Sequence, residues 1–274
     1  MDTMIIALYC RCDDWIGALH PQEAGSTSRM SDAEVVTAAL VAAVYFAGHH
    51  DHARLVLQEQ GYIPTMLSKS RFNRRLHQLY PLLEQLFEGW REVGKQANRS
   101  QLYAVDSFPL AVCDNKRIPR SRRYQGEQWR GYPASKRRYF YGVKVHLLVT
   151  EQGLPVECLV TAGSMHDAKA FPHLRLDLPV GSKIVADKAY NHYALEDELA
   201  QVGIALSPLR KANSKRPVLP YVTYWRQLKR KVVETTGSLL ERLLPKHIHS
   251  VTADGFELKL LTFLFAITVT ALLA

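Results

Sequence analysis

The sequence predicts a mixed α/β (α+β) fold, in which an all-helical N-terminal segment precedes a mixed sheet with flanking helices. Residues 1–100 contain apolar runs of helical length, with a helix-start signal before the longest of them. From Gln101 onward, short β-rich runs are separated by turns and alternate with helical stretches. The 274 residues, 47% hydrophobic and 22% charged, are typical of a globular chain with one large or two ordinary domains.

The N-terminal segment contains three predicted helices. Ser31 and Glu34 form a capping-box pattern, and the run from Val35 to Ala47 that follows is apolar nearly all round, which predicts a central, buried helix. A second helix is expected over 51–60 and a third over 70–80. The third has apolar residues on one face and a basic stripe on another, which favours contact with DNA phosphates, although basic surface helices are common: Arg71, Arg74 and Arg75.

Other features of the chain point away from metal-binding cysteine motifs, secretion and membrane insertion. The four cysteines show no CxxC pair, and no secretory leader opens the sequence, so a reducing cytoplasm is expected. The apolar run over 260–274 is shorter than the ~20 residues that span a bilayer and predicts a buried terminal helix. The histidines of the GHHDH stretch at 48–52 are interpreted as a solvated turn.

The remaining elements follow in the order βββαβαβα, which is the ribonuclease-H-like arrangement with a mixed five-stranded sheet. The first strand, in QLYAVDSFPL at 101–110, is expected to stop at Pro109. The other segments are strands over 139–150, 156–161, 183–186 and 203–208, and helical stretches over 167–174, 193–202 and 224–244.

Two of these strands run into carboxylates, Asp106 and Asp187. If the strands are neighbours, the two acids meet at one edge of the sheet, and a divalent cation is the usual way to keep close carboxylates ionised. Glu234 on the late helix is the candidate for a third ligand, with Glu241 as a competitor seven residues on. The alternatives are turn acids for the two aspartates and an i,i+4 ion pair with Arg230 for Glu234. His146 and Asp167 are expected near the site as a core histidine and a helix cap.

The positive charge of the chain is concentrated in residues 114–144. This segment holds ten of the Lys and Arg residues against two acids, which accounts for nearly all of the formal net charge of +9. Basic residues alternating with Tyr and Trp favour phosphate contact and base stacking, with a solvated loop as the alternative. The predicted DNA contacts here are Lys116, Arg117, Arg120, Arg122, Arg123, Arg130, Lys136, Arg137 and Arg138. A second basic loop is expected to grip the DNA backbone through Arg210, Lys211, Lys215 and Arg216.

Several blocks together resemble insertion-sequence transposases of the DDE class, most closely insertion sequence family 982. They are SRFNRRLHQL, VDSFPLAVCDNKRIPRSRRY, YFYGVKVHLLVT, ADKAYN, SPLRKANSKRP and VVETTGSLLERLLPKHIHSVTADGFELK. The resemblance implies Asp106, Asp187 and Glu234 as a catalytic metal-binding triad. Of the Tyr-x2-Arg-x3-Glu-x6-Lys signature of broader relatives, Arg230 and Glu234 match, whereas Gln227 and Glu241 replace the Tyr and the Lys.

The resemblance also implies two domains with different functions and a set of partners. Residues 1–100 would form a helical DNA-binding domain and residues 101–274 the catalytic domain. The expected cofactor is Mg²⁺, with Mn²⁺ able to substitute, because hard carboxylate oxygens suit both metals. The expected partners are double-stranded DNA with terminal inverted repeats, target DNA and a second copy of the chain, in a prokaryotic, nucleoid-associated location without a membrane. A DNA-binding protein without catalysis and a ribonuclease-H-like nuclease remain the alternatives.

Overall fold

The computed structural model describes residues 1–274 except 20–28, 134–136, 246–247, 249 and 274. By its internal contacts the chain divides into two compact units. We call Met1–Trp90 with Leu240–Ala274 the helical unit, and Arg91–Leu239 the sheet unit. The division differs from the one expected at residue 100, because the C-terminal segment belongs with the N-terminal helices.

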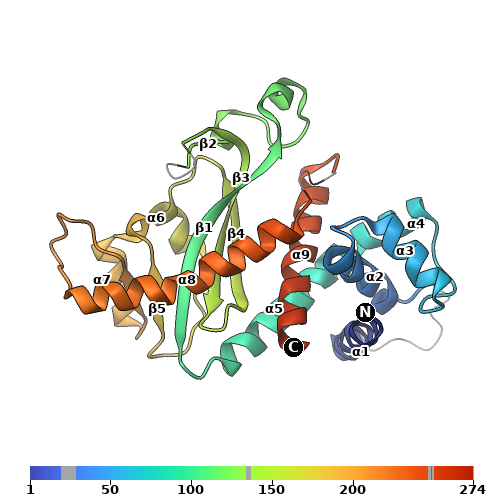
Figure 1. Ribbon diagram of the computed structural model, residues 1–274, viewed down its shortest axis with the longest axis horizontal. Helices are drawn as coiled ribbons and strands as arrows, with labels where there is room; N and C mark the ends of the chain where they lie inside the picture. The colour runs from blue at the N-terminus through green and yellow to red at the C-terminus, as the bar shows by residue number, and fades with distance from the viewer. Residues whose placement is uncertain (20–28, 134–136, 246–247, 249, 274) are drawn as a thin grey trace. The chain divides into compact units, whose positions relative to one another are not determined.

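The helical unit is built around α2, Asp32–Tyr45, which is buried without a break from Val35 to Ala43. The predicted capping box is present: the Ser31 hydroxyl accepts from the Glu34 N–H at 3.1 Å, and the Ser31 N–H donates to Glu34 Oε2 at 2.7 Å. The C-terminal helix α9, Ala253–Leu273, packs against α2 (Figure 1) and is largely buried, as its apolar sequence predicted. The other helices are α1 Asp2–Leu19, α3 His50–Glu59, α4 Lys69–Gln78 and α5 Tyr80–Ala97, whose last turns belong to the sheet unit.

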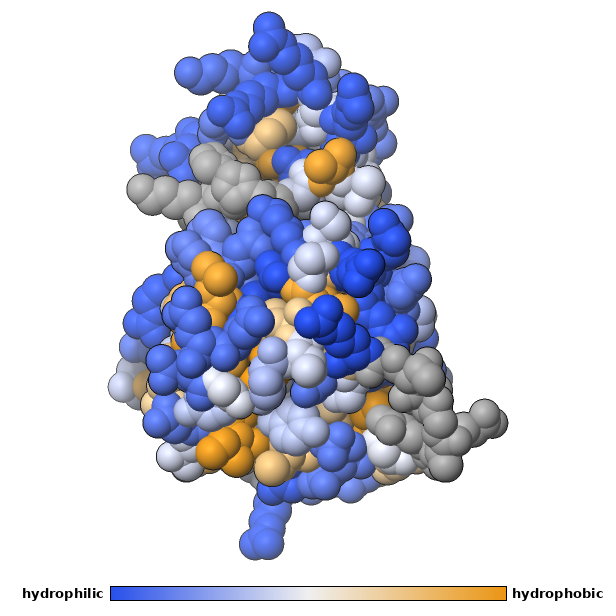
Figure 2. All heavy atoms as spheres, turned by 90° about the vertical axis from the view of Figure 1, so that its right-hand side faces the viewer, coloured by the Kyte–Doolittle hydropathy of each residue, from blue (hydrophilic) through white to orange (hydrophobic). Residues whose placement is uncertain are grey.

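No single helix in the described ranges is long and apolar enough to cross a membrane. Helices α2 and α3 are long and apolar enough only when they are taken together, and the chain bends by 112° at the break between them. On the face drawn in Figure 2, hydrophilic side chains predominate, and hydrophobic ones show as separate small areas. Scattered apolar side chains of this kind are normal on a protein surface.

In its described residues, the sheet unit contains six strands and the helices that flank them. The strands are β1 Leu102–Cys113, β2 Arg130–Gly131, β3 Phe140–Thr150, β4 Pro155–Ala162, β5 Lys183–Ala186 and β6 Ala205–Pro208. The α-helices are α6 Asp167–Ala170, α7 Tyr193–Gln201 and α8 Pro220–Leu243, whose last turn enters the helical unit. Four 3₁₀ turns lie at Asn115–Arg120, Glu127–Trp129, Phe171–His173 and Lys188–Tyr190.

The topology is the ribonuclease-H-like one that the order of elements predicted. Strand β3 pairs antiparallel with β1 and β4, whereas β5 pairs parallel with β1 and β6 pairs parallel with β5. The five predicted strands therefore lie in the order β4-β3-β1-β5-β6, and the two-residue β2 also pairs with β3. The expected mixed sheet with flanking helices is confirmed, with β2 as an addition from the basic segment.

The prediction that β1 stops at Pro109 is wrong, because the strand runs on to Cys113. Strand β5 pairs with β1 only from Leu102 to Val105, so beyond Val105 β1 has β3 as its sole partner. A proline is tolerated there because one side of the strand is an open edge, where a missing N–H breaks no ladder bond. Asp106 consequently lies inside a long strand, at the point where its parallel neighbour ends.

Helix α8 lies across the sheet (Figure 1), and printed contacts along its length agree with that placement. Near its start, the ammonium of Lys183 on β5 lies 4.4 Å from the ring centroid of Trp225. Further along, the Thr236 hydroxyl donates to the Gly153 carbonyl in the β3–β4 turn at 2.9 Å. These contacts hold α8 where Arg230 and Glu234 face the sheet edge that carries Asp106.

Candidate active site

Asp106 and Asp187 lie side by side at the edge of the sheet. The last parallel pair of β1 and β5 is Val105 with Ala186, and each aspartate is the next residue along its strand. Both side chains are partly buried, and Asp187 precedes the 3₁₀ turn Lys188–Tyr190. The two carboxylates are close enough for the charge of Asp187 to act on the titration of Asp106. The convergence expected from the sequence is therefore present in the backbone register.

A hydrogen-bond donor, a cation and two other acids surround the carboxylate of Asp106. The backbone N–H of Ser107 donates to its Oδ1 at 2.8 Å, and the guanidinium of Arg230 forms an ion pair with Oδ2. Burial raises the pKa of Asp106 to about 6, with smaller upward contributions from Asp187 and Asp167, although Arg230 and the Ser107 N–H oppose the shift. A shifted carboxyl next to other acids is common in active sites, whereas a solvated turn acid does not show this pattern.

Arg230 on α8 contacts two of the three predicted metal ligands. Its guanidinium pairs with Asp106 and also with Glu234, one turn further along the helix. The alternative i,i+4 pairing of Glu234 is thus present in the structure. Arg230, which is also one of the predicted DNA contacts, is 17% exposed and Glu234 is 49% exposed, so most of the surface of the arginine side chain is covered by the protein.

Within the described ranges, no three His, Cys, Asp or Glu side chains gather tightly enough to form a ready-made metal site. The guanidinium of Arg230 instead neutralises Asp106 and Glu234 as a cation of the protein's own. Carboxylate oxygens are hard ligands that suit divalent ions such as Mg²⁺ or Mn²⁺, so the donor chemistry of Asp106, Asp187 and Glu234 fits such an ion. Glu241, the competing carboxylate, lies beyond the sheet unit in the part of α8 that belongs to the helical unit.

Asp167 joins a polar network next to Asp106 rather than capping its helix. Its Oδ1 accepts from the Ser107 hydroxyl at 2.7 Å and from the Lys144 ammonium at 3.2 Å. Lys144 also donates to the Met165 carbonyl at 2.6 Å. The expectation of a cap is wrong because His166 is the N-cap residue of α6. A signal was available in the sequence, since Lys144 and His146 alternate on one face of β3.

His146 is the buried end of this network. Its Nε2 lies 2.9 Å from the Thr161 hydroxyl, and its Nδ1 lies 3.9 Å from Asp167 Oδ1. Burial lowers the pKa of His146 to about 4, with Lys144 acting in the same direction against Asp167. The ring is therefore neutral at pH 7, in agreement with the expected core histidine.

The basic segment 114–144 presents most of its predicted contacts to solvent. Two of its arginines bind the protein itself: Arg123 donates to the Val112 carbonyl at 2.7 Å, and Arg130 pairs with Glu127 at 3.2 Å. Lys136 lies outside the described residues. The exposed members are Lys116, Arg117, Arg120, Arg122, Arg130, Arg137 and Arg138.

The aromatic residues of this segment pack in pairs. The ring centroids of Tyr124 and Trp129 lie 4.5 Å apart, and those of Tyr132 and Tyr139 lie 4.8 Å apart. Tyr132 and Tyr139 are 53% and 60% exposed, so their rings remain accessible to a partner. Exposed aromatic faces beside arginines are suited to stacking on unpaired bases.

The second basic loop is largely bound to α7. Arg210 makes a bidentate ion pair with Glu196 at 2.6 and 2.7 Å, and Arg216 pairs with Asp197 at 2.8 Å while stacking on Tyr193. Lys211 and Lys215 are exposed. Of the four predicted DNA contacts in this loop, the two arginines therefore bind the loop to α7.

The basic stripe on α4 also contains both exposed and paired arginines. Arg71 and Arg74 are exposed, whereas Arg75 forms an ion pair with Asp32 at the start of α2. The packing of Phe72 and Leu76 into the core of the helical unit fixes which face of α4 is exposed.

One family of known proteins matches the part of the chain that carries this site. The family model described as "Transposase DDE domain" matches residues 96–249, which is more than half of the chain. No curated protein matches. Among solved structures, the cryo-EM structure of the piggyBac transposase synaptic complex with hairpin DNA is similar, with 10% identity, a TM-score of 0.47, and coverage of 99% of this chain and 73% of that chain. On the family match, the chain belongs to the transposase DDE domain family.

Proposed function

We propose that this protein is an insertion-sequence transposase, of the family 982 type, that cleaves DNA at the ends of its element and transfers the 3′-hydroxyl strands to target DNA. The observation that carries the proposal is the adjacency of Asp106 and Asp187, one position beyond the last parallel pair of β1 and β5, with Glu234 joined to Asp106 through Arg230. Membership of the transposase DDE domain family supports it.

The proposed chemistry is in-line displacement at phosphorus, with Asp106, Asp187 and Glu234 holding Mg²⁺, or Mn²⁺ in its place. A pair of metal ions held by these residues would supply activation of the attacking hydroxyl and stabilisation of the leaving oxygen. The Ser107 N–H orients Asp106, and the Ser107 hydroxyl ties the strand to Asp167. Arg230 holds Asp106 and Glu234 together before DNA binds and then turns its guanidinium to the incoming phosphate.

The proposed partner is double-stranded DNA carrying terminal inverted repeats, followed by target DNA. The exposed arginines of 114–144 would grip phosphates near the cleaved end, and Arg71 and Arg74 in residues 1–100 would contribute to recognition of the repeat. We further propose a homodimer in the DNA complex and a cytoplasmic, nucleoid-associated location in a prokaryotic cell.

A second candidate is a DNA-binding protein of the same family without catalysis. The observation in its favour is the ion pair of Arg230 with both Asp106 and Glu234, because a guanidinium held there competes with a metal ion. The two candidates differ in one measurable respect: only the first nicks DNA.

The test is metal-dependent nicking of a duplex that carries the terminal repeat, which sequencing of the DNA flanking the gene would identify. Asp106→Asn, Asp187→Asn and Glu234→Gln should each abolish nicking with Mg²⁺ and with Mn²⁺, non-additively, while DNA binding persists. Glu241→Gln is the matched control and should nick normally. If the unmodified chain binds the repeat and never nicks it, the non-catalytic candidate replaces the first.

A further inference from the structure

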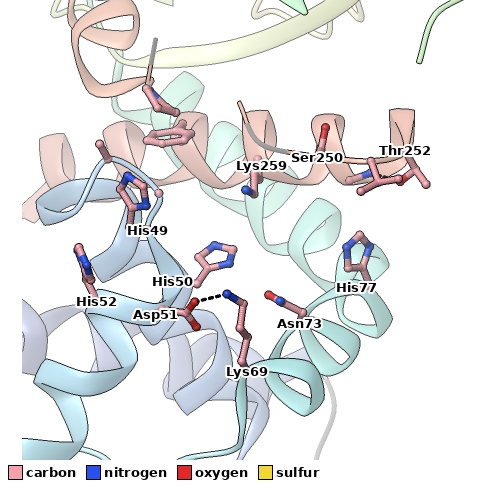
Figure 3. A pocket seen from close by; sticks show the side chains of 16 residues that line it. His49, His50, Asp51, His52, Lys69, Asn73, His77, Ser250, Thr252 and Lys259 are labelled. Carbon is pink, nitrogen blue, oxygen red and sulfur yellow. Dashed lines mark hydrogen bonds and ion pairs between the residues drawn. The ribbon is translucent and has the colours of Figure 1, made fainter. Parts of the chain in front are cut away.

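The helical unit contains a cavity of about 700 Å³ (Figure 3), and none of the predicted catalytic residues is among its lining residues. One wall is the face of α4 formed by Lys69, Asn73 and His77, which are spaced four residues apart and therefore lie in one row. The facing wall is the row Gly255, Lys259 and Phe263 of α9, spaced in the same way. The start of α3, with His50 and Asp51, forms a further part of the lining.

Basic and hydrogen-bonding side chains from three helices converge on this cavity. Figure 3 shows Lys69, Lys259 and His50 directed toward its centre, with Asn73 and His77 beside them. His50 hydrogen-bonds to Asn73, and its ring packs edge-on against Phe72 at a centroid distance of 5.6 Å. The interpretation of GHHDH as a solvated turn is therefore wrong for His50, which is half-buried and lines the cavity.

The one acid among the lining residues, Asp51, is already neutralised. It pairs with Lys69 at 2.6 Å and with Arg54 at 2.9 Å, so two cations surround one carboxylate. Lys259 adds a third positive charge from the opposite wall, and burial lowers the pKa of its ammonium. A cation in a partly dry cavity is stabilised by an anion, because the low local dielectric strengthens their attraction.

The three helices also begin at the cavity. His50 is the first residue of α3, Lys69 is the first residue of α4, and Gly255 is in the first turn of α9. Within the described residues, the caps His49 and Ser68 make no side-chain hydrogen bond to their helices. The N–H of Gly255 already donates to the Thr252 hydroxyl at 3.1 Å and that of His50 to the Gly48 carbonyl at 3.1 Å. The contribution of the helix starts is therefore the positive ends of their dipoles, which favour negative charge and add to the effect of the lysines.

We propose that this cavity is a phosphate-binding site, in which Lys259 and Lys69 hold a phosphate group from opposite walls. The apolar part of the lining, with Phe263, is suited to a sugar attached to that phosphate. The ligand is therefore a nucleic-acid strand or a free nucleotide-like phosphate, which share this chemistry. The inference goes beyond the proposed catalytic function, and its failure would leave the predicted roles of Asp106, Asp187 and Glu234 unchanged.

The first experiment titrates the full chain with inorganic phosphate at constant ionic strength, followed by calorimetry. The unmodified protein should bind saturably, and Lys259→Met should weaken binding by about tenfold or more, as expected for the loss of a charge-assisted hydrogen bond. Arg11→Met is the matched control, because it removes one positive charge from an exposed position on α1 and should change the affinity by less than about twofold.

A second variant tests the cavity without changing its charge. A Cβ at Gly255 would lie 3.2 Å from the Thr252 hydroxyl and 3.3 Å from His77 Cε1, so Gly255→Gln should crowd the space and weaken phosphate binding while the cations remain. The proposal is overturned if phosphate produces no more heat than chloride, or if Lys259→Met and Gly255→Gln both bind it as Arg11→Met does.

Binding to duplex DNA then separates the two sources of phosphate. If the site holds the DNA backbone, Lys259→Met should lower the slope of log affinity against log salt by about one unit relative to Arg11→Met, and inorganic phosphate should compete with DNA. If the site holds a free phosphate compound, the two variants should bind DNA equally while still differing in phosphate binding.

Discussion

The basic segment 114–144 and the basic loop 210–216 have similar compositions but use their charges differently. In the segment, seven of the predicted contacts are exposed, and the two arginines that bind the protein itself are Arg123 and the exposed Arg130. In the loop, Arg210 and Arg216 are bound to acids of α7. The difference comes from the neighbours, since α7 supplies Glu196 and Asp197 within reach, whereas Asp114 and Glu127 are the only acids in the segment. A run of basic residues therefore predicts DNA contact only where the fold leaves the charges unpaired.

The largest expected effect comes from removing exposed charge in the segment. Replacing Arg117, Arg122, Arg137 and Arg138 together with Ala should lower the slope of log DNA affinity against log salt by about 3 to 4 units, because about 0.9 counterions are released for each phosphate contact. The measurement is fluorescence anisotropy over a salt series. Arg99→Ala, an exposed arginine outside the segment, is the control, and an unchanged slope for the fourfold variant would remove the segment from the DNA interface.

Arg210→Ala should act on stability instead of DNA binding. Glu196 is 6% exposed, so the variant leaves a buried carboxylate without its bidentate partner and should lower the free energy of unfolding by about 3 kcal/mol. Urea unfolding measures this loss, and the double variant Arg210→Met with Glu196→Leu should recover most of it. If Arg210→Ala also lowers the slope of log DNA affinity against log salt by about one unit, Arg210 contacts DNA as well.

Lys211→Ala with Lys215→Ala tests the exposed half of the loop. The pair should lower the salt slope of DNA binding by up to about 2 units and change the free energy of unfolding by less than about 0.5 kcal/mol. The same two assays apply, which makes Arg210→Ala the direct counterpart. No change in either assay would exclude the loop from the DNA interface.

The smallest expected effect separates two neighbouring arginines of α4. Arg74→Ala should lower the salt slope of binding to terminal-repeat DNA by about one unit, because Arg74 is exposed. Arg75→Ala should leave the slope unchanged and cost at most about 1 kcal/mol of stability, because its guanidinium pairs with Asp32 at a partly exposed position. The reverse pattern would mean that α4 contacts DNA through a different face.

Local signals in the sequence were sufficient to predict much of the fold. The capping box of Ser31 and Glu34 starts α2 as predicted, and the five main strands follow their β-rich runs. The adjacency of Asp106 and Asp187 was also predictable, because both follow short β-rich runs of the sequence and ribonuclease-H-like topology makes the two strands neighbours. The continuation of β1 past Pro109 was not predictable, because it depends on β5 ending at Ala186 and leaving an open edge.

The sequence by itself determined the order of elements, the buried faces and the three candidate acids, since these depend on residue type and periodicity along the chain. Only the tertiary structure decided which charges far apart in the sequence are paired. Arg230 meets Asp106 across 124 positions of sequence, Asp167 meets Ser107 across 60, and Lys259 faces the same cavity as Lys69. Such pairings depend on how distant elements pack, and because electrostatic interactions fall off steeply with distance and exposure, no local pattern encodes them.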